Sequence, residues 1–370
     1  MNEYADIIII GAGMAGASIG AHLAQHRKVV MLEAESEAGY HSTGRSAAAF
    51  DPSYGNPVIN SLTRAARPYF AAGTSSGLAY LTQRRALWLA DDESIDAYNA
   101  LLQANPHIKQ LDLAETQRYC PKIKTASIKA AAIEDDVHDI DVDLLHQEFL
   151  SAMRSADADI IMNALVMSIQ RKNNQWRLTC KDRTYSAPII VNAAGAWGDE
   201  VARMAGVEPV GLQPKRRTAA LVEPPIGVDC RHWPLIADAA ERWYCRPMGM
   251  RLMISPADET PVEPCDAAPE EIDVATGIDR FEQKIDFHVQ QVPHRWAGLR
   301  CFVEDKSPVI GFDPEVAGFF WCVGQGGYGI QTAPAAGIAG ASILLRRKLP
   351  DDLLAAGIDI EALSPKRLRN

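Results

Sequence analysis

The stretch Ile7-Ile8-Ile9-Ile10-Gly11-Ala12-Gly13-Met14-Ala15-Gly16 decides the fold, together with Val29-Val30-Met31-Leu32-Glu33 further along the chain. The four isoleucines predict a strand that is apolar on both faces, as a buried parallel strand needs. Gly11 permits the tight turn after this strand, Gly13 lets the backbone approach a pyrophosphate, and Gly16 lets the next helix pack closely on the strand. Strand, glycines and helix therefore predict the start of a βαβ unit.

The second half of this unit indicates its ligand. A helix from about Met14 to Gln25 directs its N-terminal N–H groups toward the pyrophosphate. The following strand ends at Glu33, whose carboxylate can accept both hydroxyl groups of an adenosine ribose. A glycine-rich βαβ unit with no ligand would leave that acid unexplained, so the sequence predicts a dinucleotide site.

Length and charge restrict the class of protein. The 370 residues, 47% of them hydrophobic, can bury a sizeable core and suggest two domains. A formal net charge of −10 argues against nucleic acid as a partner and leaves no basic face for anionic lipid. The seven cysteines are scattered and form no CxxC pair, which suits a reducing compartment and predicts neither disulfides nor a metal site.

The apolar beginning of the chain does not resemble a signal peptide. Glu3 and Asp6 stand where a basic region would be, and the glycines interrupt the apolar run. No uninterrupted apolar segment is long enough to span a bilayer, so no transmembrane segment is expected. We expect a cytoplasmic protein, either free or attached peripherally at the inner face of the membrane.

A small, polar segment follows the first unit: Gly39-Tyr40-His41-Ser42-Thr43-Gly44-Arg45-Ser46-Ala47-Ala48-Ala49. Its backbone N–H groups and hydroxyls can bind phosphates or the edge of a flat ring. A solvated loop is the alternative, but three successive alanines suit the underside of an aromatic system better than a free surface.

Helices and strands alternate through the next part of the chain. The patterns predict helices over 57–70, 93–103, 113–119 and 142–153, and strands over 85–89, 160–162, 165–170 and 176–181. A further buried strand begins at Ile189 and ends in the small residues up to Trp197, so a cofactor can lie across its carboxyl end.

The stretch 215–302 changes character. Alternating segments such as 242–246 and 251–254 predict an antiparallel sheet that is inserted into the nucleotide-binding fold and can roof a pocket. An acidic, proline-rich excursion over 258–271 interrupts this sheet. We expect it to be a solvated loop, and a mobile lid is the alternative.

A second glycine pattern, Gly324-Gln325-Gly326-Gly327-Tyr328-Gly329-Ile330, lies between a strand over 319–323 and a helix over 331–346. No strand follows that helix, so a second dinucleotide unit is not expected. Instead, we expect the glycines to meet the edge of a redox ring. The helix N-terminus would then stabilise the negative charge that develops when the ring is reduced.

Together these motifs resemble the D-amino-acid oxidase and glycine oxidase superfamily of flavoproteins, and within it the bacterial FAD-dependent D-amino-acid dehydrogenases of the D-arginine dehydrogenase type. The resemblance covers nearly the whole chain and rests on 11–33, 39–48, 192–197, 211–217, 296–300 and 325–331. It implies an α/β fold with a discontinuous, Rossmann-like FAD-binding domain over 1–80, 140–214 and 303–370. It also implies an inserted α+β substrate domain, built on an antiparallel sheet, over 81–139 and 215–302.

The same resemblance implies that FAD is bound non-covalently. The residues that match the family's cofactor contacts are Gly11, Gly13, Met14, Ala15, Gly16, Glu33, Ala34, Ser42, Thr43, Gly44, Arg45, Ser46, Ala47, Ala48, Val166, Ala194, Gly195, Trp197, Gly326, Gly327, Tyr328, Gly329, Ile330 and Gln331. A thioether link to the flavin from Cys301 or Cys322 is not expected.

The resemblance further implies a substrate site. Arg217 and Arg300 would hold the substrate carboxylate, and the Gly327 carbonyl would accept a hydrogen bond from the substrate amine. Tyr54 and Tyr244 would line and cover the pocket, although a core position is the commoner fate of a tyrosine.

The residues themselves support the two arginines. Each lies in a mostly apolar strand, where an unpaired guanidinium is costly, and two such forks suit an anionic carboxylate. A structural ion pair with an acid such as Glu304 is the alternative. Arg216 is the rival of Arg217, because neighbours on a strand face opposite sides of the sheet.

The expected pocket walls are Ala49, Ala86, Leu235 and Ala237. Arginine-selective members of the family place an acid near the position of Ala86 and a histidine at that of Ala49, and this chain has neither. Without an anion, a cationic side chain would lose several kcal/mol on desolvation. We therefore expect neutral, apolar D-amino acids to be preferred over D-arginine.

The reaction implied by the resemblance is oxidative deamination of a D-amino acid. Hydride passes from Cα to flavin N5, and the imine hydrolyses to a 2-keto acid and ammonia. Electrons then pass to oxygen or to a quinone of the respiratory chain, and both acceptors stay open. Neither His41 nor His138 is assigned a catalytic role.

Three other functions stay open. The bulky pocket walls argue against a glycine- or sarcosine-type amine oxidase, and the missing second nucleotide unit argues against a flavin monooxygenase. A catalytically silent FAD-binding subunit would not need both Arg217 and Arg300.

Overall fold

A six-stranded sheet lies at the centre of the nucleotide-binding half. The computed structural model describes residues 2–369. The strand order is β10 (Asp159–Ile161), β3 (Val29–Leu32), β2 (Ile7–Ile10), β14 (Ile189–Asn192), β22 (Phe319–Val323) and β21 (Val309–Phe312). The first five strands are parallel and β21 is antiparallel to β22. Strand β2 is therefore interior to the sheet, and all four of its isoleucines are buried, as predicted.

The chain reverses direction across the sheet between β2 and β14. From β2 it proceeds outward through β3 to β10, and it later returns to β14 on the other side of β2. A crevice at the carboxyl ends of the strands is expected at such a point. Gly11 lies there with φ +103°, and a Cβ on it would come 2.6 Å from the carbonyl oxygen of Ala193. Only glycine fits this approach.

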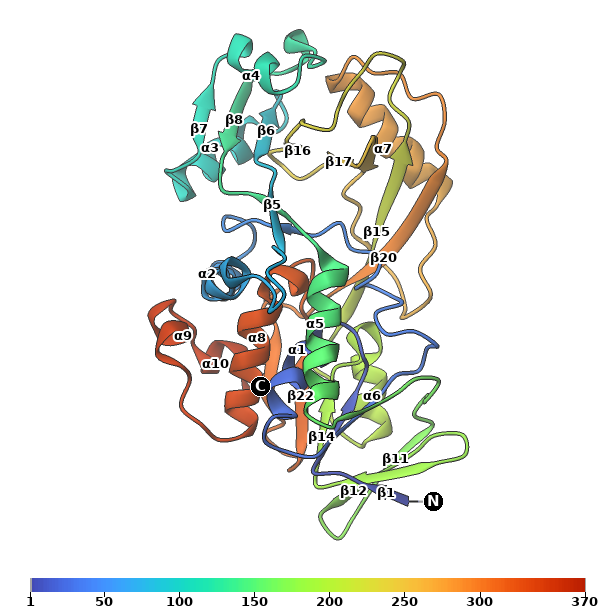
Figure 1. Ribbon diagram of the computed structural model, residues 1–370. Coiled ribbons are helices and arrows are strands. Elements are labelled where there is room, and N and C mark those ends of the chain that lie inside the picture. The colour runs from blue at the N-terminus through green and yellow to red at the C-terminus, as the bar shows by residue number, and fades with distance from the viewer. Residues whose placement is uncertain (1, 370) are drawn as a thin grey trace.

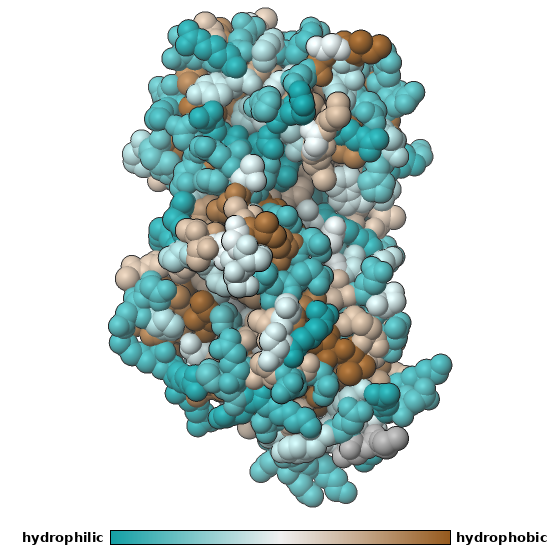
Figure 2. Space-filling model, in the orientation of Figure 1, coloured by the Kyte–Doolittle hydropathy of each residue, from teal (hydrophilic) through white to brown (hydrophobic). Residues whose placement is uncertain are grey.

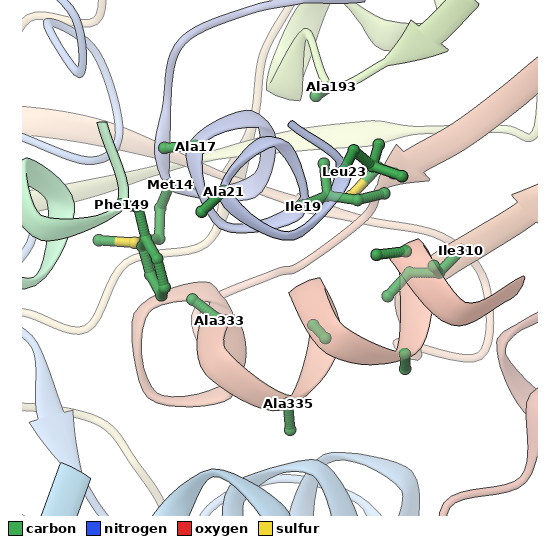
Figure 3. Packing of buried hydrophobic residues seen from close by; sticks show 14 of the residues in the cluster. Met14, Ala17, Ile19, Ala21, Leu23, Phe149, Ala193, Ile310, Ala333 and Ala335 are labelled. Atoms are coloured by element: carbon green, nitrogen blue, oxygen red, sulfur yellow. The ribbon is translucent and has the colours of Figure 1, made fainter. Parts of the chain in front are cut away.

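Closely packed helices cover the sheet. Helix α1 (Met14–Leu23) contacts α8 (Gly329–Leu344), α5 (Val142–Ser155) also packs on α1, and α2 (Pro57–Ala72) packs on α8. Figure 3 shows α1 lying over α8, with small side chains such as Ala21 and Ala333 near the contact. A Cβ on Gly337 would come 2.7 Å from the carbonyl oxygen of Ser18, so the two backbones approach more closely than larger residues allow. This packing joins the two glycine-rich segments of the chain.

A larger sheet occupies the other half of the molecule, in the upper part of Figure 1. Its order is β19 (Thr260–Pro261), β15 (Gln213–Val222), β18 (Arg251–Ser255), β17 (Tyr244–Met248), β16 (Leu235–Asp238), β6 (Ala86–Ala90), β8 (Ala130–Glu134) and β7 (Lys109–Leu111), with β20 (His294–Phe302) also paired to β15. All neighbours are antiparallel except β16 and β6. The predicted antiparallel sheet is present, and it draws on two separate segments of the chain.

Two small sheets complete the strands. One contains β1 (Asn2–Tyr4), β13 (Thr184–Ala187), β12 (Gln175–Thr179) and β11 (Ser168–Lys172), and the other contains β4 (Ala49–Phe50), β9 (His138–Ile140) and β5 (Leu81–Gln83). The remaining helices are α3 (Ile95–Ala104), α4 (Leu113–Tyr119), α6 (Gly198–Met204), α7 (Glu271–Lys284), α9 (Asp351–Ala355) and α10 (Ile360–Leu363). We propose that the two large sheets are the centres of two domains with the boundaries expected from the sequence.

Most of the predicted elements are present close to their predicted ranges, but several observed elements were not predicted, and α7 is one of the longest of these. Its hydrophobic content is low, and it buries only Val274, Gly277 and Phe281 among its residues. Figure 2 shows that the face in view is mostly hydrophilic, with apolar residues in separate patches. Within residues 2–369, no helix combines the length and the apolar character needed to cross a bilayer.

Candidate active site

A cavity of about 510 Å³ lies between the two large sheets. Its lining includes the glycine loop after β2, the carboxyl end of β14, the loop before α8, and residues of β15, β16, β17 and β20. The segment 39–49 also contributes most of its residues to the lining. The cavity therefore joins the predicted dinucleotide site to the predicted substrate site.

Most of the predicted site residues line this cavity. They are Gly11, Gly13, Met14, Ala15, Glu33, Ala34, Ser42, Thr43, Arg45, Ser46, Ala47, Ala48, Ala49, Tyr54, Val166, Ala194, Gly195, Trp197, Arg217, Leu235, Ala237, Tyr244, Arg300, Gly326, Gly327, Gly329, Ile330 and Gln331. Segments far apart in the sequence thus supply one continuous surface.

Four predicted residues are not in the lining. Gly16 and Gly44 instead permit close backbone contacts, since a Cβ on Gly16 would lie 2.0 Å from the oxygen of Gly11. Tyr328 precedes α8, and its ring centroid lies 4.8 Å from that of Tyr54. The placement of Ala86 in the pocket wall is wrong: it is fully buried in β6, and Trp88, two residues along on the same face, lines the cavity instead.

The dinucleotide end has the shape and polarity that FAD needs. Glu33 accepts hydrogen bonds from the backbone N–H of Ala12 (2.7 Å) and of Glu35 (3.0 Å), which leaves lone pairs on both oxygens for ribose hydroxyls. Neither α1 nor α8, both within the described part of the chain, has an acidic residue in its first turn. The positive ends of both helices are therefore not neutralised locally, and they favour an anionic group.

Side chains from both halves fix the segment 39–48. The Thr43 hydroxyl accepts the N–H of Met14 (3.0 Å), and the Ser42 hydroxyl donates to the carbonyl of Leu299 (2.7 Å). Arg246 donates to the carbonyl of Ala48 (3.0 Å). The segment is thus attached both to the start of α1 and to the larger sheet, as a cofactor-binding loop between two domains requires.

Arg300 carries the positive charge of the substrate end. Its Nη1 donates to the hydroxyl of Tyr54 (2.9 Å), and within residues 2–369 no carboxylate lies at ion-pair distance from it. Burial alone would lower the pKa of Arg300, but Tyr54 and Tyr244 raise it, so the group is charged. A buried cation without a counter-ion is expensive, and an anionic ligand would remove much of that cost.

Arg217 also lines the cavity, but it is already paired. Its Nη2 lies 3.2 Å from a carboxylate oxygen of Glu259, and its Nε donates to the carbonyl of Asp258 (2.8 Å). The ion-pair alternative therefore holds for this arginine, with Glu259 rather than Glu304 as the acid. Arg216 points to the opposite face, where it pairs with Glu270 and Asp273, so Arg217 is the one that faces the cavity.

Electrostatic effects are strong at the two cavity tyrosines. Burial would raise the pKa of Tyr244, but the charges of Arg300 and Arg217 outweigh burial and lower it. Burial raises the pKa of Tyr54 despite the nearby Arg300. The raised pKa keeps the Tyr54 hydroxyl protonated around neutral pH, so it can donate a hydrogen bond within the cavity.

The expectation that the pocket lacks a carboxylate is wrong. Asp51 and Glu241 both line the cavity, from the loop after β4 and from the turn between β16 and β17. Neither lies in the strand segment near Ala86, where the family's acid was expected. The sequence pattern around that strand could not reveal them, because they reach the cavity from other elements.

Other cavity residues were also missed. The larger ones are Trp88, Trp243, Trp296, Leu299, His41, Leu165 and Met204. Trp296 lies in the predicted 296–300 motif, and its indole N–H donates to the carbonyl of Arg45 (3.0 Å), so the motif itself was the available signal. His41 and Leu299 likewise lie in the predicted motifs 39–48 and 296–300. Trp88 and Trp243 carry no local signal, because buried aromatic residues usually belong to the core.

Most residues of the acidic excursion are exposed, as expected of a solvated loop, and ion pairs attach it to the rest of the molecule. Glu259 pairs with Arg217 and with Lys215 (2.9 Å), and Asp266 pairs with Arg45. The side chains that it binds therefore include one predicted substrate arginine and one predicted cofactor-segment arginine.

Two cysteines near the cavity are unreactive. Cys301 lines the cavity and Cys322 is buried behind it, and burial raises the pKa of each to about 12. The thiol form does not act as a nucleophile. Within the described residues, no group of three or more metal-ligating side chains comes together.

Comparison with known proteins gives the family. The model of the DAO family, described as FAD dependent oxidoreductase, matches residues 6–342. The chain belongs to this family. FAD is accordingly its cofactor, and the glycine loops, Glu33 and the segment 39–48 are the parts of the chain that fit it.

Relatives of this family member are distant. FAD-dependent oxidoreductase domain-containing protein 1 of Xenopus laevis is 25% identical over 93% of this chain and 79% of its own length. Glycine oxidase of Bacillus licheniformis is 23% identical over 96% of this chain and 97% of its own. The solved glycine oxidase of Geobacillus kaustophilus superposes with a TM-score of 0.84 at 20% identity, covering 99% of both chains, which shows the shared fold. The resemblance to the D-arginine dehydrogenase type stays a prediction.

Proposed function

We propose that this FAD-dependent oxidoreductase oxidises D-amino acids to imino acids, which hydrolyse to 2-keto acids and ammonia. The observation that carries the proposal is Arg300, a charged guanidinium that has no carboxylate partner among the described residues and lies in a cavity shared with the cofactor site. The ligand that suits this arrangement is a small carboxylate with an oxidisable group next to it.

Each residue at the substrate end of the cavity would have a definite role. Arg300 would bind the substrate carboxylate with help from Arg217, and Tyr54 and Tyr244 would donate hydrogen bonds to it. The Gly327 carbonyl would accept from the amine and so orient Cα. The apolar walls would exclude water, which strengthens these contacts. Bound FAD supplies the two-electron acceptor for the Cα hydride.

The pocket walls support a neutral, apolar substrate side chain. Ala49, Leu235, Ala237 and Trp88 form an apolar surface. Glu241 is exposed at the rim, where a carboxylate contributes only about 0–1 kcal/mol to binding a cation. D-arginine should therefore be a poorer substrate than D-leucine. The preference for D-leucine should be smaller than in a pocket that contains no carboxylate.

An anaerobic titration tests the proposal. The yellow holoenzyme is mixed with D- and L-forms of leucine and arginine, with glycine and with sarcosine, and flavin bleaching is recorded. We expect D-leucine to bleach fastest. Bleaching by glycine or sarcosine alone would instead assign the glycine/sarcosine-type activity, which the glycine oxidase relatives make the leading alternative. No bleaching by any of them would leave a silent FAD-binding subunit. Bleaching by NADPH would indicate a monooxygenase.

The electron acceptor and location follow from the same proposal. We propose that reduced flavin passes electrons to oxygen or a quinone, and that the protein acts in the cytoplasm or at the inner face of the membrane. Reoxidation of the bleached enzyme by air, compared with a soluble quinone analogue, distinguishes the acceptors.

A further inference from the structure

Asp51 is a buried carboxylate on the cavity wall. Its side chain is 7% exposed, and its Oδ1 accepts the N–H of Ser53 (2.9 Å). The N–H of Tyr54 also acts on this carboxyl group, and the residue lines the cavity. A carboxylate has about four acceptor positions, so a buried one that faces a cavity can still accept from a ligand group that donates to it.

The backbone around Asp51 lies beside the proposed reacting end. Its N–H donates to Oε1 of Gln331 (2.9 Å) in the first turn of α8. Three residues on, the Tyr54 hydroxyl bonds Arg300, whose guanidinium lies against Gly327. Asp51 is therefore tied to the same residues that would hold the substrate carboxylate and amine.

A second carboxylate stands behind Asp51. Glu134 is fully buried at the end of β8, where it accepts from the Ser53 hydroxyl (2.5 Å) and from the Trp88 indole (3.2 Å). His107, half exposed, lies 3.3 Å from the same Glu134 oxygen. These contacts extend from the cavity wall to the surface.

Burial and neighbouring groups shift the pKa of Asp51. Burial and the negative charge of Glu134 raise its pKa well above the ordinary value, and Glu241 adds to this effect. The N–H groups of Ser53 and Tyr54 act in the opposite direction. A carboxylate with a raised pKa is, when ionised, a stronger base than an ordinary one.

The proposed reaction needs such a group. A D-amino acid arrives with an ammonium group, and the C–H bond can give up hydride only after one N–H proton leaves. The balance is R–CH(NH₃⁺)–COO⁻ to R–C(=NH₂⁺)–COO⁻, with one proton and one hydride released. The hydride goes to the flavin under the proposed function, and the proton needs an acceptor.

We propose that the carboxylate of Asp51 accepts the proton from the substrate ammonium, and that Glu134 is a positioning residue that acts on Asp51 from the side away from the cavity. The inference rests on the proposed function. Tyr244 is the competing acceptor, but its hydroxyl is held by Ser255 and Arg217. Glu241 is exposed and therefore a weaker candidate.

The experiment is anaerobic flavin reduction by D-leucine in a stopped-flow instrument from pH 5 to 10. Because Asp51 must be ionised, kcat/KM of the wild-type enzyme should rise with pH through the Asp51 pKa. In Asp51→Asn it should fall about 10²-fold at pH 7 and recover tenfold per pH unit as free amine accumulates. Glu134→Gln should move the acid limb to lower pH, because it removes the negative charge that raises the pKa of Asp51.

Asp136→Asn, at an exposed ion pair outside the cavity, is the matched control. It should keep the wild-type acid limb. FAD absorbance confirms that each variant is folded, and the pH dependence of thermal stability gives a second readout that does not depend on activity. An unchanged limb in Asp51→Asn, or a loss equal at all pH values, would overturn the inference. If the wild-type enzyme is not bleached by any amino acid, the proposed function fails instead.

Discussion

The guanidinium of Arg300 lies flat against Gly327. A Cβ at position 327 would come 2.6 Å from Nη1, 2.8 Å from Cζ and 3.0 Å from Nε. The glycine is therefore required by the arginine, not by a backbone conformation. Gly327→Ala should displace Arg300 and raise KM for the amino acid roughly tenfold or more, because the carboxylate contact weakens. Steady-state kinetics measures this effect.

Gly298→Ala is the matched control for that prediction. Gly298 also lines the cavity, but a Cβ there would meet only the Cβ of Arg45, at 3.4 Å. We expect its KM to stay within twofold of wild type. Equal KM values for both variants would mean that Arg300 does not bind the substrate.

The two cavity arginines should differ in importance. Arg300 has no carboxylate partner among the described residues, whereas Glu259 already compensates Arg217. Arg300→Met should lower kcat/KM by about 10²-fold or more, since losing one member of a desolvated charge pair costs about 2–5 kcal/mol. Arg217→Met should cost about tenfold. Arg295→Met, on the same strand β20 but half exposed, should change little. Equal losses at 217 and 300 would contradict the asymmetry.

Asp51 should also make the thermal stability of the protein depend on pH. Its folded pKa is raised above the unfolded value, so its protonated form stabilises the fold at low pH, and this contribution is lost as pH rises through the folded pKa. Asp51→Asn cannot ionise and should melt higher than wild type at neutral pH, by roughly 2–4 °C per kcal/mol. The advantage should shrink toward pH 4 in thermal melts. Asp136→Asn, at an exposed ion pair with Arg67, should show no such gain.

The flavin should be held without a covalent bond. Burial raises the pKa of the Cys301 and Cys322 thiols to about 12, so neither is a thiolate that could attack the ring. Acid precipitation should release the yellow colour into the supernatant. Colour that stays with the pellet in the wild type but not in Cys301→Ser would show a thioether instead.

Local motifs predicted the nucleotide half well. The isoleucine run, the glycines and Glu33 interact over short stretches of sequence, so their spacing is enough to predict the βαβ unit. Arg217 and its outward-facing neighbour Arg216 were also distinguishable, because strand alternation places them on opposite faces.

The acids around the substrate cavity could not be predicted in this way. Glu134 lies directly opposite Ala86 across the β6–β8 pairing, so the residues of β6 alone do not reveal it. Asp51 enters from a loop, and Glu259 enters from the excursion that pairs with β15. Their positions depend on the register between distant strands, which no local pattern records.

The cofactor site needs two glycine-rich segments that are far apart in the sequence, and this imposes an order on its formation during synthesis. The cofactor site needs both the loop at Gly11 and the turn before α8 at Gly329, and α1 packs directly on α8. At about 5–20 residues per second, a ribosome takes roughly 15–60 s to pass from one to the other. During that interval α5 is available to pack on α1 but α8 is not, and the FAD site is complete only after the segment that contains Gly329 has been translated.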